Sequence, residues 1–173
     1  MIRYILTYCL LFLFSITLIS QDSIPKQGFR IKVQKTTMEK ARDSVYQARI
    51  TLDEIDGHYI PRDLLDCFKE LNKIMEPSAK EAFMEIPDSI VDARTHGMLG
   101  LYLEKRWSIS EGSRLTAYFR KMKVPHYDYM IGIIIQSYHR HLHGRPLQVR
   151  EQVNYFNELW AIKKAKMYQQ LMD

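Results

Sequence analysis

The feature that most constrains the fold is an apolar run from Met130 to Ile135, which is broken only by Gly132. On a helix these side chains point to nearly every side, so neighbouring elements must cover the helix all round. The run therefore predicts a central, buried helix. A chain of 173 residues is long enough to surround that helix with one ordinary core.

Apolar residues recur at helical spacing before this run. Thr36 and Glu39 are spaced as a capping box, which predicts a helix that starts there and is stopped by Gly57. We expect its stripe to pack on its own domain, the alternative being a coiled-coil seam with another chain. The stripe comprises Met38, Ala41, Val45, Ala48, Leu52 and Ile55.

The middle of the chain predicts two shorter helices. One begins at Pro61, a residue suited to the first helical position, and carries Cys67 on its buried face. The next opens on a capping box formed by Ser78 and Glu81 and ends at Pro87.

Two glycines and a cap mark the helices around the central one. Gly97 and Gly100 lie on a helix that ends at Trp107, and each costs about 1 kcal/mol relative to alanine, which close approach of a neighbouring helix would offset. Asp128 is expected to cap the central helix, and a long helix follows Pro146. We expect that last helix to pack on the domain through Val149, Val153, Phe156, Trp160, Met167 and Leu171.

These patterns predict an all-α fold, a compact single-domain multi-helix array over residues 36–173 with a long C-terminal helix. Residues 21–35 predict a loosely attached arm, because the lone strand-like alternation within them has no strand to pair with. The alternative is an edge strand that pairs with a partner. The alternation is formed by Phe29, Ile31 and Val33.

Residues 1–20 are typical of a cleavable signal peptide, with a positive start, an apolar run and the small residue Ser20 at the end. Leu18 is larger than the residue usually preferred at its position, so an uncleaved anchor is the alternative. Cys9 lies inside the apolar run, which argues against lipid attachment. We therefore predict an exported protein, periplasmic or extracellular, without a stable membrane anchor after cleavage.

Charge and cysteine content limit the partners. The chain has 25 Lys+Arg and 20 Asp+Glu, interleaved along the sequence, and cleavage removes only Arg3 from this balance. A nucleic-acid binder would concentrate its basic residues on one face, so nucleic acid is not expected as a partner. Cys67 is the only cysteine left after cleavage, which excludes an internal disulfide.

The sharpest chemical motif is a pair of histidines, His139 and His143, at the spacing that lets two imidazoles share a metal on one helix face. However, Arg140 stands where a zincin motif places its glutamate, and no nearby His/Cys pair completes a ligand set. We favour a hydrogen-bonded core histidine and helix-end residues, with no metal and no cofactor. The alternative is a periplasmic metal-dependent hydrolase that uses this pair.

No nucleophile supports catalysis. Ser113 and Ser137 lack the strand-turn-helix elbow of serine hydrolases, and Cys67 is predicted to be buried. The sequence therefore favours a binding or protein-interaction module over an enzyme.

The second half of the chain contains a series of short motifs: Arg106-Trp107, Gly112-Ser113-Arg114-Leu115, Tyr118-Phe119 and Ser137-Tyr138-His139-Arg140. With these motifs the chain resembles a small bacterial domain family of unknown function. The resemblance extends over about residues 60–160 and implies a domain boundary but no activity.

The candidate binding residues are the forked donors and rings of this same segment, namely Arg106, Arg114, Tyr138, His139 and Arg140. Folding that gathers several arginines would hold a carboxylate or phosphate group bidentately, so the expected partner is a protein or an anionic ligand. We expect Arg114→Met to affect binding above all, because Arg114 opens its helix near solvent. Arg140→Met should chiefly destabilise, because Arg140 follows the most apolar stretch.

Overall fold

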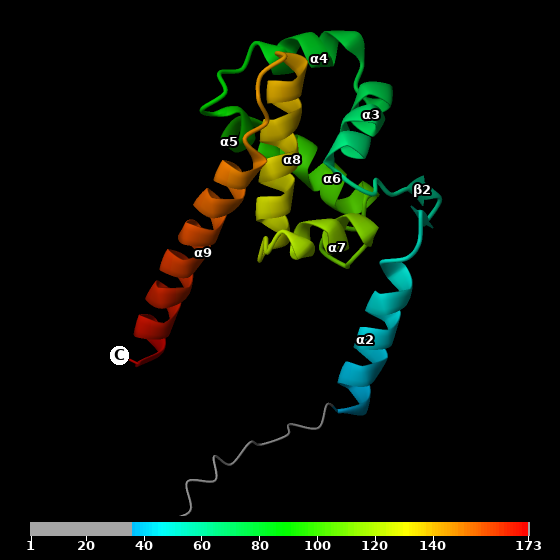
Figure 1. Ribbon diagram of the computed structural model, residues 1–173, viewed down its shortest axis with the longest axis vertical. Coiled ribbons are helices and arrows are strands. Elements are labelled where there is room, and N and C mark those ends of the chain that lie inside the picture. The colour runs from blue at the N-terminus through cyan, green and yellow to red at the C-terminus, as the bar shows by residue number, and fades with distance from the viewer. Residues whose placement is uncertain (1–35, 173) are drawn as a thin grey trace, which may run out of the picture. The chain divides into compact units, whose positions relative to one another are not determined.

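The computed structural model describes residues 36–172, and Figure 1 shows how their helices follow one another. The chain divides into two units, residues 1–34 and 35–173, and every described residue lies in the second. The predicted signal peptide (residues 1–20) and arm (residues 21–35) lie outside the described part. Within that part the fold is all-α with a long C-terminal helix, as the sequence predicts, and one small sheet.

Helix α8 (Tyr127–Leu142) is the centre of the core, which confirms the prediction from its apolar run. Met130 and Ile131, and the isoleucines that follow, are at most 1% exposed. The helix begins after His126, whose ring accepts a hydrogen bond from the N–H of Asp128, so Asp128 is not the cap that we expected. The elements packed against α8 are α3 (Leu64–Ile74), α4 (Pro77–Met84), α5 (Val91–Thr95), η1 (His96–Gly100), α6 (Leu101–Arg106), α7 (Arg114–Lys121) and α9 (Val149–Met172).

Helices α3 and α4 cover one side of α8. Helix α3 starts after Asp63, whose carboxylate caps it by accepting the N–H of Asp66 at 2.9 Å, and Cys67 is buried on its inner face as predicted. Helix α4 starts with Pro77 and has no side-chain cap, so the predicted capping box at Ser78 is wrong. Proline at the first helical position supplies the helical φ, and the N–H that it lacks would have had no partner within the helix.

Segments α5, η1 and α6 follow one another without a break, and η1 is a π-helical turn. The expected close approach is confirmed for Gly100, where an added Cβ would lie 3.0 Å from Cγ2 of Ile131 on α8. It is wrong for Gly97, where an added Cβ would meet no atom of another element within 4 Å. The glycine that the sequence did not point out is Gly132, where a Cβ would lie 2.9 Å from the Phe156 ring of α9.

The first described helix, α2 (Thr37–Arg49), begins with the predicted capping box: the N–H of Thr36 donates to Glu39 at 2.7 Å and the N–H of Glu39 donates to Thr36 at 3.2 Å. The helix ends before the predicted stripe does. Strands β1 (Glu54–Ile55) and β2 (His58–Tyr59) follow and form an antiparallel hairpin. Its two turn residues, Asp56 and Gly57, both have positive φ, as tight hairpin turns require.

The predicted packing of the α2 stripe is wrong, because α2 contributes no buried residue and Met38 is 71% exposed. Polar contacts near its C-terminus attach it instead. Arg49 donates from Nε to the carbonyl of Gly112 at 3.1 Å and pairs with Glu111 at 3.0 Å. The Tyr46 ring lies against Gly112, leaving no room there for a Cβ.

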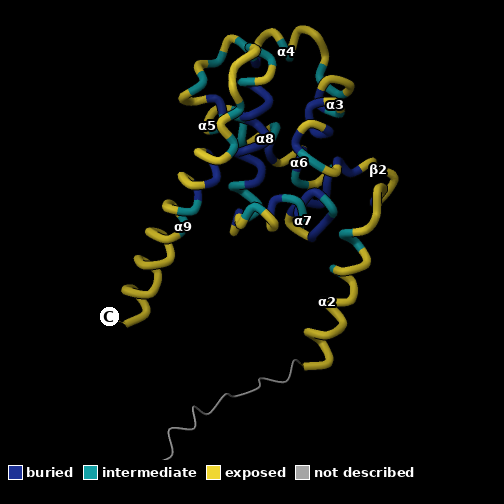
Figure 2. Tube along the Cα trace, viewed as in Figure 1, coloured by how far each residue is buried: buried dark blue, intermediate teal, exposed yellow. Residues whose placement is uncertain are grey.

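Helix α9 packs on α8 through its first half, where Gln152, Val153 and Phe156 are buried. Figure 2 shows that the distal part of the helix, residues 161–172, is exposed. Met167 and Leu171 are 50% and 76% exposed, so the expected packing of the whole stripe is wrong for its distal part. No helix within residues 36–172 is both long enough and apolar enough to cross a membrane.

Candidate functional site

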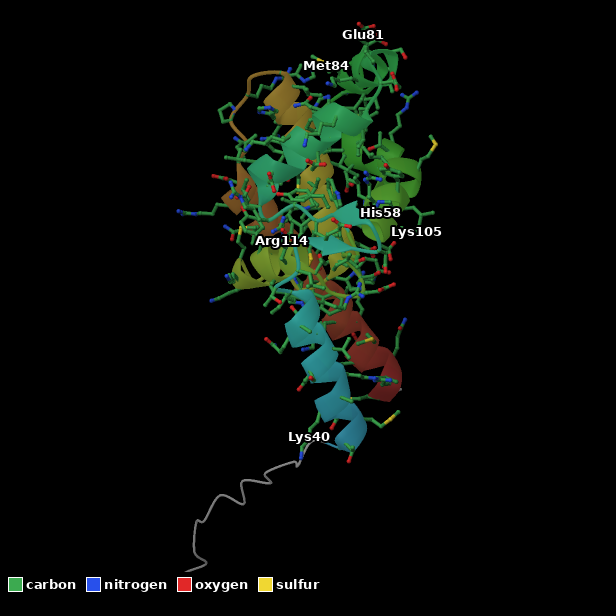
Figure 3. All side chains as sticks on the ribbon, turned by 90° about the vertical axis from the view of Figure 1, so that its right-hand side faces the viewer. Lys40, His58, Glu81, Met84, Lys105 and Arg114 are labelled. Carbon is green, nitrogen blue, oxygen red and sulfur yellow. The ribbon has the colours of Figure 1, made fainter. Side chains whose placement is uncertain are left out.

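The three arginines that the sequence singles out lie in different surroundings. The guanidinium of Arg106 lies 5.8 Å from the centroid of the Tyr102 ring. Arg114 lies beside the hairpin (Figure 3), and Arg140 pairs with Asp88. The contacts of each arginine within residues 36–172 are with different residues, so they add no support to a single anion-binding cluster.

Arg114 fastens the hairpin to α7. Its Nε donates to the carbonyl of Ile60 at 2.7 Å, and its guanidinium lies 4.9 Å from the centroid of the Tyr59 ring. The Tyr59 hydroxyl in turn donates to Asp66 at 2.7 Å. Burial acts to raise the pKa of the Asp66 carboxyl, but this bond and the N–H of Arg62 outweigh it, so that pKa is lowered. Nη2 of Arg114 is buried and has no hydrogen-bond acceptor among the described residues. A binding role for Arg114 stays a prediction.

Tyr138 is a core residue of α8. It is fully buried, and its hydroxyl donates to the side-chain oxygen of Asn72 at 3.0 Å. Its ring lies 5.8 Å, centroid to centroid, from both Phe68 and Phe83, and burial raises the pKa of its phenol to about 12. Tyr138 thus faces α3 and α4, and its binding role also stays a prediction.

His139 and Arg140 meet on one acidic residue, Asp88. The two carboxylate oxygens of Asp88 lie 3.4 Å from Nδ1 of His139 and 2.9 Å from Nη2 of Arg140. Arg140 also donates to the side-chain oxygen of Gln148. Sequence reasoning missed Asp88 because it lies in a loop 52 residues before Arg140, where no periodic pattern marks it.

His139 and His143 are close but do not form a metal site with other residues of the described part. Nδ1 of His143 lies 2.9 Å from the carbonyl oxygen of His139, so this nitrogen carries the proton and donates. No group of three or more His, Cys, Asp or Glu side chains within residues 36–172 is arranged to hold a metal ion. These contacts add no support to the hydrolase alternative.

Cys67 is fully buried, and its burial raises the pKa of its thiol well above the usual value. A thiol with a raised pKa stays protonated near neutral pH and is a poor nucleophile. The structure therefore agrees with the prediction that Cys67 is inert.

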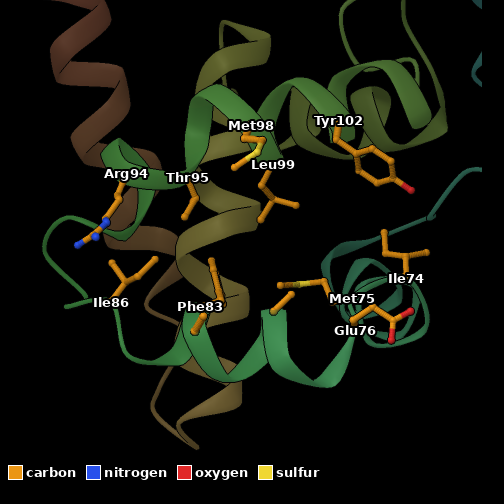
Figure 4. Close-up of a pocket in the computed structure, with 12 residues that line it drawn as sticks. Ile74, Met75, Glu76, Phe83, Ile86, Arg94, Thr95, Met98, Leu99 and Tyr102 are labelled. Atoms are coloured by element: carbon orange, nitrogen blue, oxygen red, sulfur yellow. The ribbon is translucent and has the colours of Figure 1, made fainter.

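A second candidate site is an apolar groove of about 580 Å³ between α4 and the α5–η1–α6 segment (Figure 4). Such a volume falls within the range of ligand sites, which are mostly apolar with a few polar groups. Its polar lining residues are Glu76, Arg94, Thr95 and Tyr102. Its apolar lining residues are Ile74, Met75, Ala79, Ala82, Phe83, Ile86, Met98 and Leu99.

Met98 and the two charged residues give the groove its character. Met98 lies on the π-helical turn and is 86% exposed, although its side chain is apolar. In Figure 4, Arg94 lies near Ile86 at one end of the groove, and Glu76 lies at the other. π-Helical turns are frequent at functional sites.

Sequence reasoning missed the groove, because helical spacing does not reveal which apolar faces lack a neighbour. The one signal near it was the pair of glycines within η1, Gly97 and Gly100.

Comparison with known protein families gives a match, whereas no curated protein and no solved structure matches the chain. The resemblance to a family of unknown function is confirmed at that level, and the matched segment extends from α3 and its preceding loop to the end of α8. It ends before α9, short of the boundary near residue 160 that we expected. The match identifies a domain of unknown function, DUF6794, at residues 60–142.

Proposed function

We propose that the domain is a binding module whose apolar groove takes an apolar segment of a partner polypeptide. The carrying observation is the groove itself, an open apolar surface over which Met98 is left exposed. Methionine is flexible and polarisable, so Met75 and Met98 suit a surface that adapts to a partner. Exposed apolar patches of this kind mark sites of interaction.

The charges at the two ends favour a polypeptide over a fatty acid. The guanidinium of Arg94 is exposed and has no partner among the described residues, so an acidic side chain of the partner would pair with it. Glu76 at the other end would face a basic side chain. A fatty acid offers one carboxylate and leaves Glu76 without a counterpart.

The proposal includes the cellular location. The positive start and apolar run of residues 1–20 support export, followed by work outside the cytoplasm. Mass spectrometry of the protein recovered from its host should find an N-terminus at or within a few residues of Gln21. Recovery with residues 1–20 intact in the membrane fraction would overturn this part of the proposal and leave the groove untouched.

Crosslinking in the native host tests the groove directly. Replacing Met98 with the photoreactive residue p-benzoylphenylalanine should give a protein adduct, because the side chain would lie against the partner. The matched control is the same replacement at Leu65, which is 61% exposed on α3 and does not line the groove. An adduct at Met98 alone supports the proposal, provided that it maps to an apolar segment. Lipid adducts, or equal adducts at both positions, would overturn it.

A charge swap then tests the orientation of the partner. With the crosslinked segment made as a peptide, Arg94→Glu should weaken binding about tenfold, or 1.4 kcal/mol. Exchanging the facing acid of the peptide for lysine should restore it. Arg145→Glu is the control, since Arg145 is exposed and outside the groove. Equal weakening by both substitutions would show that only net charge matters and that the Arg94 contact is wrong.

A further inference from the structure

A polar cleft of about 520 Å³ lies between α5, α8 and α9, apart from the apolar groove. Helix α5 separates the two, because Arg94 lines the groove while Asp92 lines the cleft. The cleft's polar lining includes three carboxylates and one guanidinium, those of Asp88, Asp92, Glu151 and Arg140. It therefore carries an excess of negative charge that a ligand can meet.

The carboxylates of the cleft differ in how far they are already satisfied. The pair with Arg140 at 2.9 Å neutralises Asp88, and Asp92 lies 2.8 Å from Nδ1 of His96. Glu151 has no hydrogen bond or ion pair within residues 36–172 and is exposed at the rim. Glu151 is therefore the carboxylate that is free to pair with a cation.

Gln152 supplies a second, independent sign of a ligand. It lines the cleft and is 6% exposed, and its Nε2 donates to the carbonyl of Leu147 at 2.7 Å and to Ser137 at 3.1 Å. A carbonyl only accepts, so this contact fixes which end of the amide is nitrogen. Oε1 of Gln152 is left buried without a hydrogen-bond donor among the described residues. A buried acceptor of this kind calls for a donor.

Aromatic side chains complete the cleft. Tyr155 lines it and is 58% exposed, and the buried ring of Phe156 lies 5.3 Å from the Tyr155 ring, centroid to centroid. The face of a tyrosine ring attracts cations, so the Tyr155 ring suits an ammonium group. The apolar ring surface also suits the hydrocarbon stem that carries such a group.

We propose that this cleft binds a primary ammonium group on a flexible hydrocarbon stem. The ammonium group would pair with the carboxylate of Glu151 and donate an N–H to Oε1 of Gln152. The hydrocarbon stem would lie against the Tyr155 ring. Two sources share this chemistry, a free polyamine and a lysine side chain of another protein. The inference does not depend on the function proposed for the apolar groove.

Calorimetric titration of the full chain with spermidine tests the proposal. We expect saturable binding at one site, weakened about tenfold by Glu151→Gln because one ion pair in a partly shielded cleft is lost. Tyr155→Ala should weaken it as well. The matched control is Glu158→Gln, which removes the same charge from an exposed position of α9 outside the cleft and should leave the affinity unchanged.

Further titrations distinguish the two sources of the ammonium group and define the results that would contradict the proposal. The tripeptide Lys-Lys-Lys, blocked at both ends, carries the same charge as spermidine, and tighter binding of one of the two identifies the source. Equal weakening by Glu151→Gln and Glu158→Gln, or no saturable binding, would overturn the proposal. Saturable binding of inorganic phosphate alone would also overturn it, because Nε of Arg140, a buried donor without a partner, would then be the feature that binds. Met98→Asp should leave spermidine binding unchanged, which keeps this test separate from that of the groove.

Discussion

Helices α8 and α9 both carry apolar stripes, yet α8 is the centre of the core, whereas α9 extends from the core into solvent. In α8 the apolar residues between Met130 and Ile135 are at most 1% exposed, because elements pack on every side. In α9 the stripe is buried at Val153 and Phe156, whereas Leu171 near the C-terminal end of the helix is exposed. The comparison shows that an apolar stripe predicts a helix face, whereas burial depends on whether another element lies opposite that face.

The largest contrast should come from removing side chains in the two helices. Ile134→Ala should lower the free energy of unfolding by about 2–5 kcal/mol, because Ile134 is fully buried and the cavity has no access to solvent. Leu171→Ala should change it by less than about 0.5 kcal/mol, since Leu171 is 76% exposed. Urea unfolding followed by circular dichroism measures both. Similar losses at the two sites would mean that the distal part of α9 is covered in solution.

A pair of glycines in η1 tests how tightly α8 is enclosed. Gly100→Ala should cost about 1–3 kcal/mol, because the added Cβ would lie only 3.0 Å from Cγ2 of Ile131, which is 1% exposed in the core. Gly97→Ala, three residues earlier on the same turn, should instead stabilise by up to about 1 kcal/mol through helix propensity. Thermal unfolding of the two variants gives the sign. Stabilisation by both would show that α8 and η1 are less closely packed than the structure has them.

A substitution of Arg114 tests the polar contacts that attach the β1–β2 hairpin to α7. Its contacts with Ile60 and Tyr59 favour a structural role, whereas its place at a helix start favours a binding role. Arg114→Met should lower the free energy of unfolding by about 1–3 kcal/mol, because the carbonyl of Ile60 loses its donor in a buried site. Unchanged stability together with lost partner binding would instead support the binding role that the sequence predicts for Arg114.

The same contrast explains what the sequence could predict. The central helix, the buried face around Cys67 and the cap at Thr36 follow from spacing within a few residues, where side-chain periodicity and capping chemistry act. Asp88 could not be predicted as a site residue, because its partners His139 and Arg140 lie far from it in the sequence. The groove and the cleft could not be predicted for a related reason. Each is formed by residues of several helices, and no local sequence pattern shows how those helices are placed relative to one another.

The smallest effect should come from deleting residues 162–173. Residues 162–172 form the exposed end of α9. These residues are exposed, and in α9 the packing ends near Trp160, whose ring lies 6.3 Å from that of Tyr129, centroid to centroid. The deletion should change the free energy of unfolding by no more than about 0.5 kcal/mol, as expected where little apolar surface leaves the core. Phe156→Ala is the control on the same helix and should cost about 3–5 kcal/mol, since its ring packs beside Gly132 and Tyr129. Sedimentation of the intact and shortened chains should accompany the unfolding measurement. If the deletion costs more than about 1 kcal/mol and also reduces the sedimentation coefficient to that of a smaller species, then the distal stripe is covered by a second copy, and α9 resembles α8 after all.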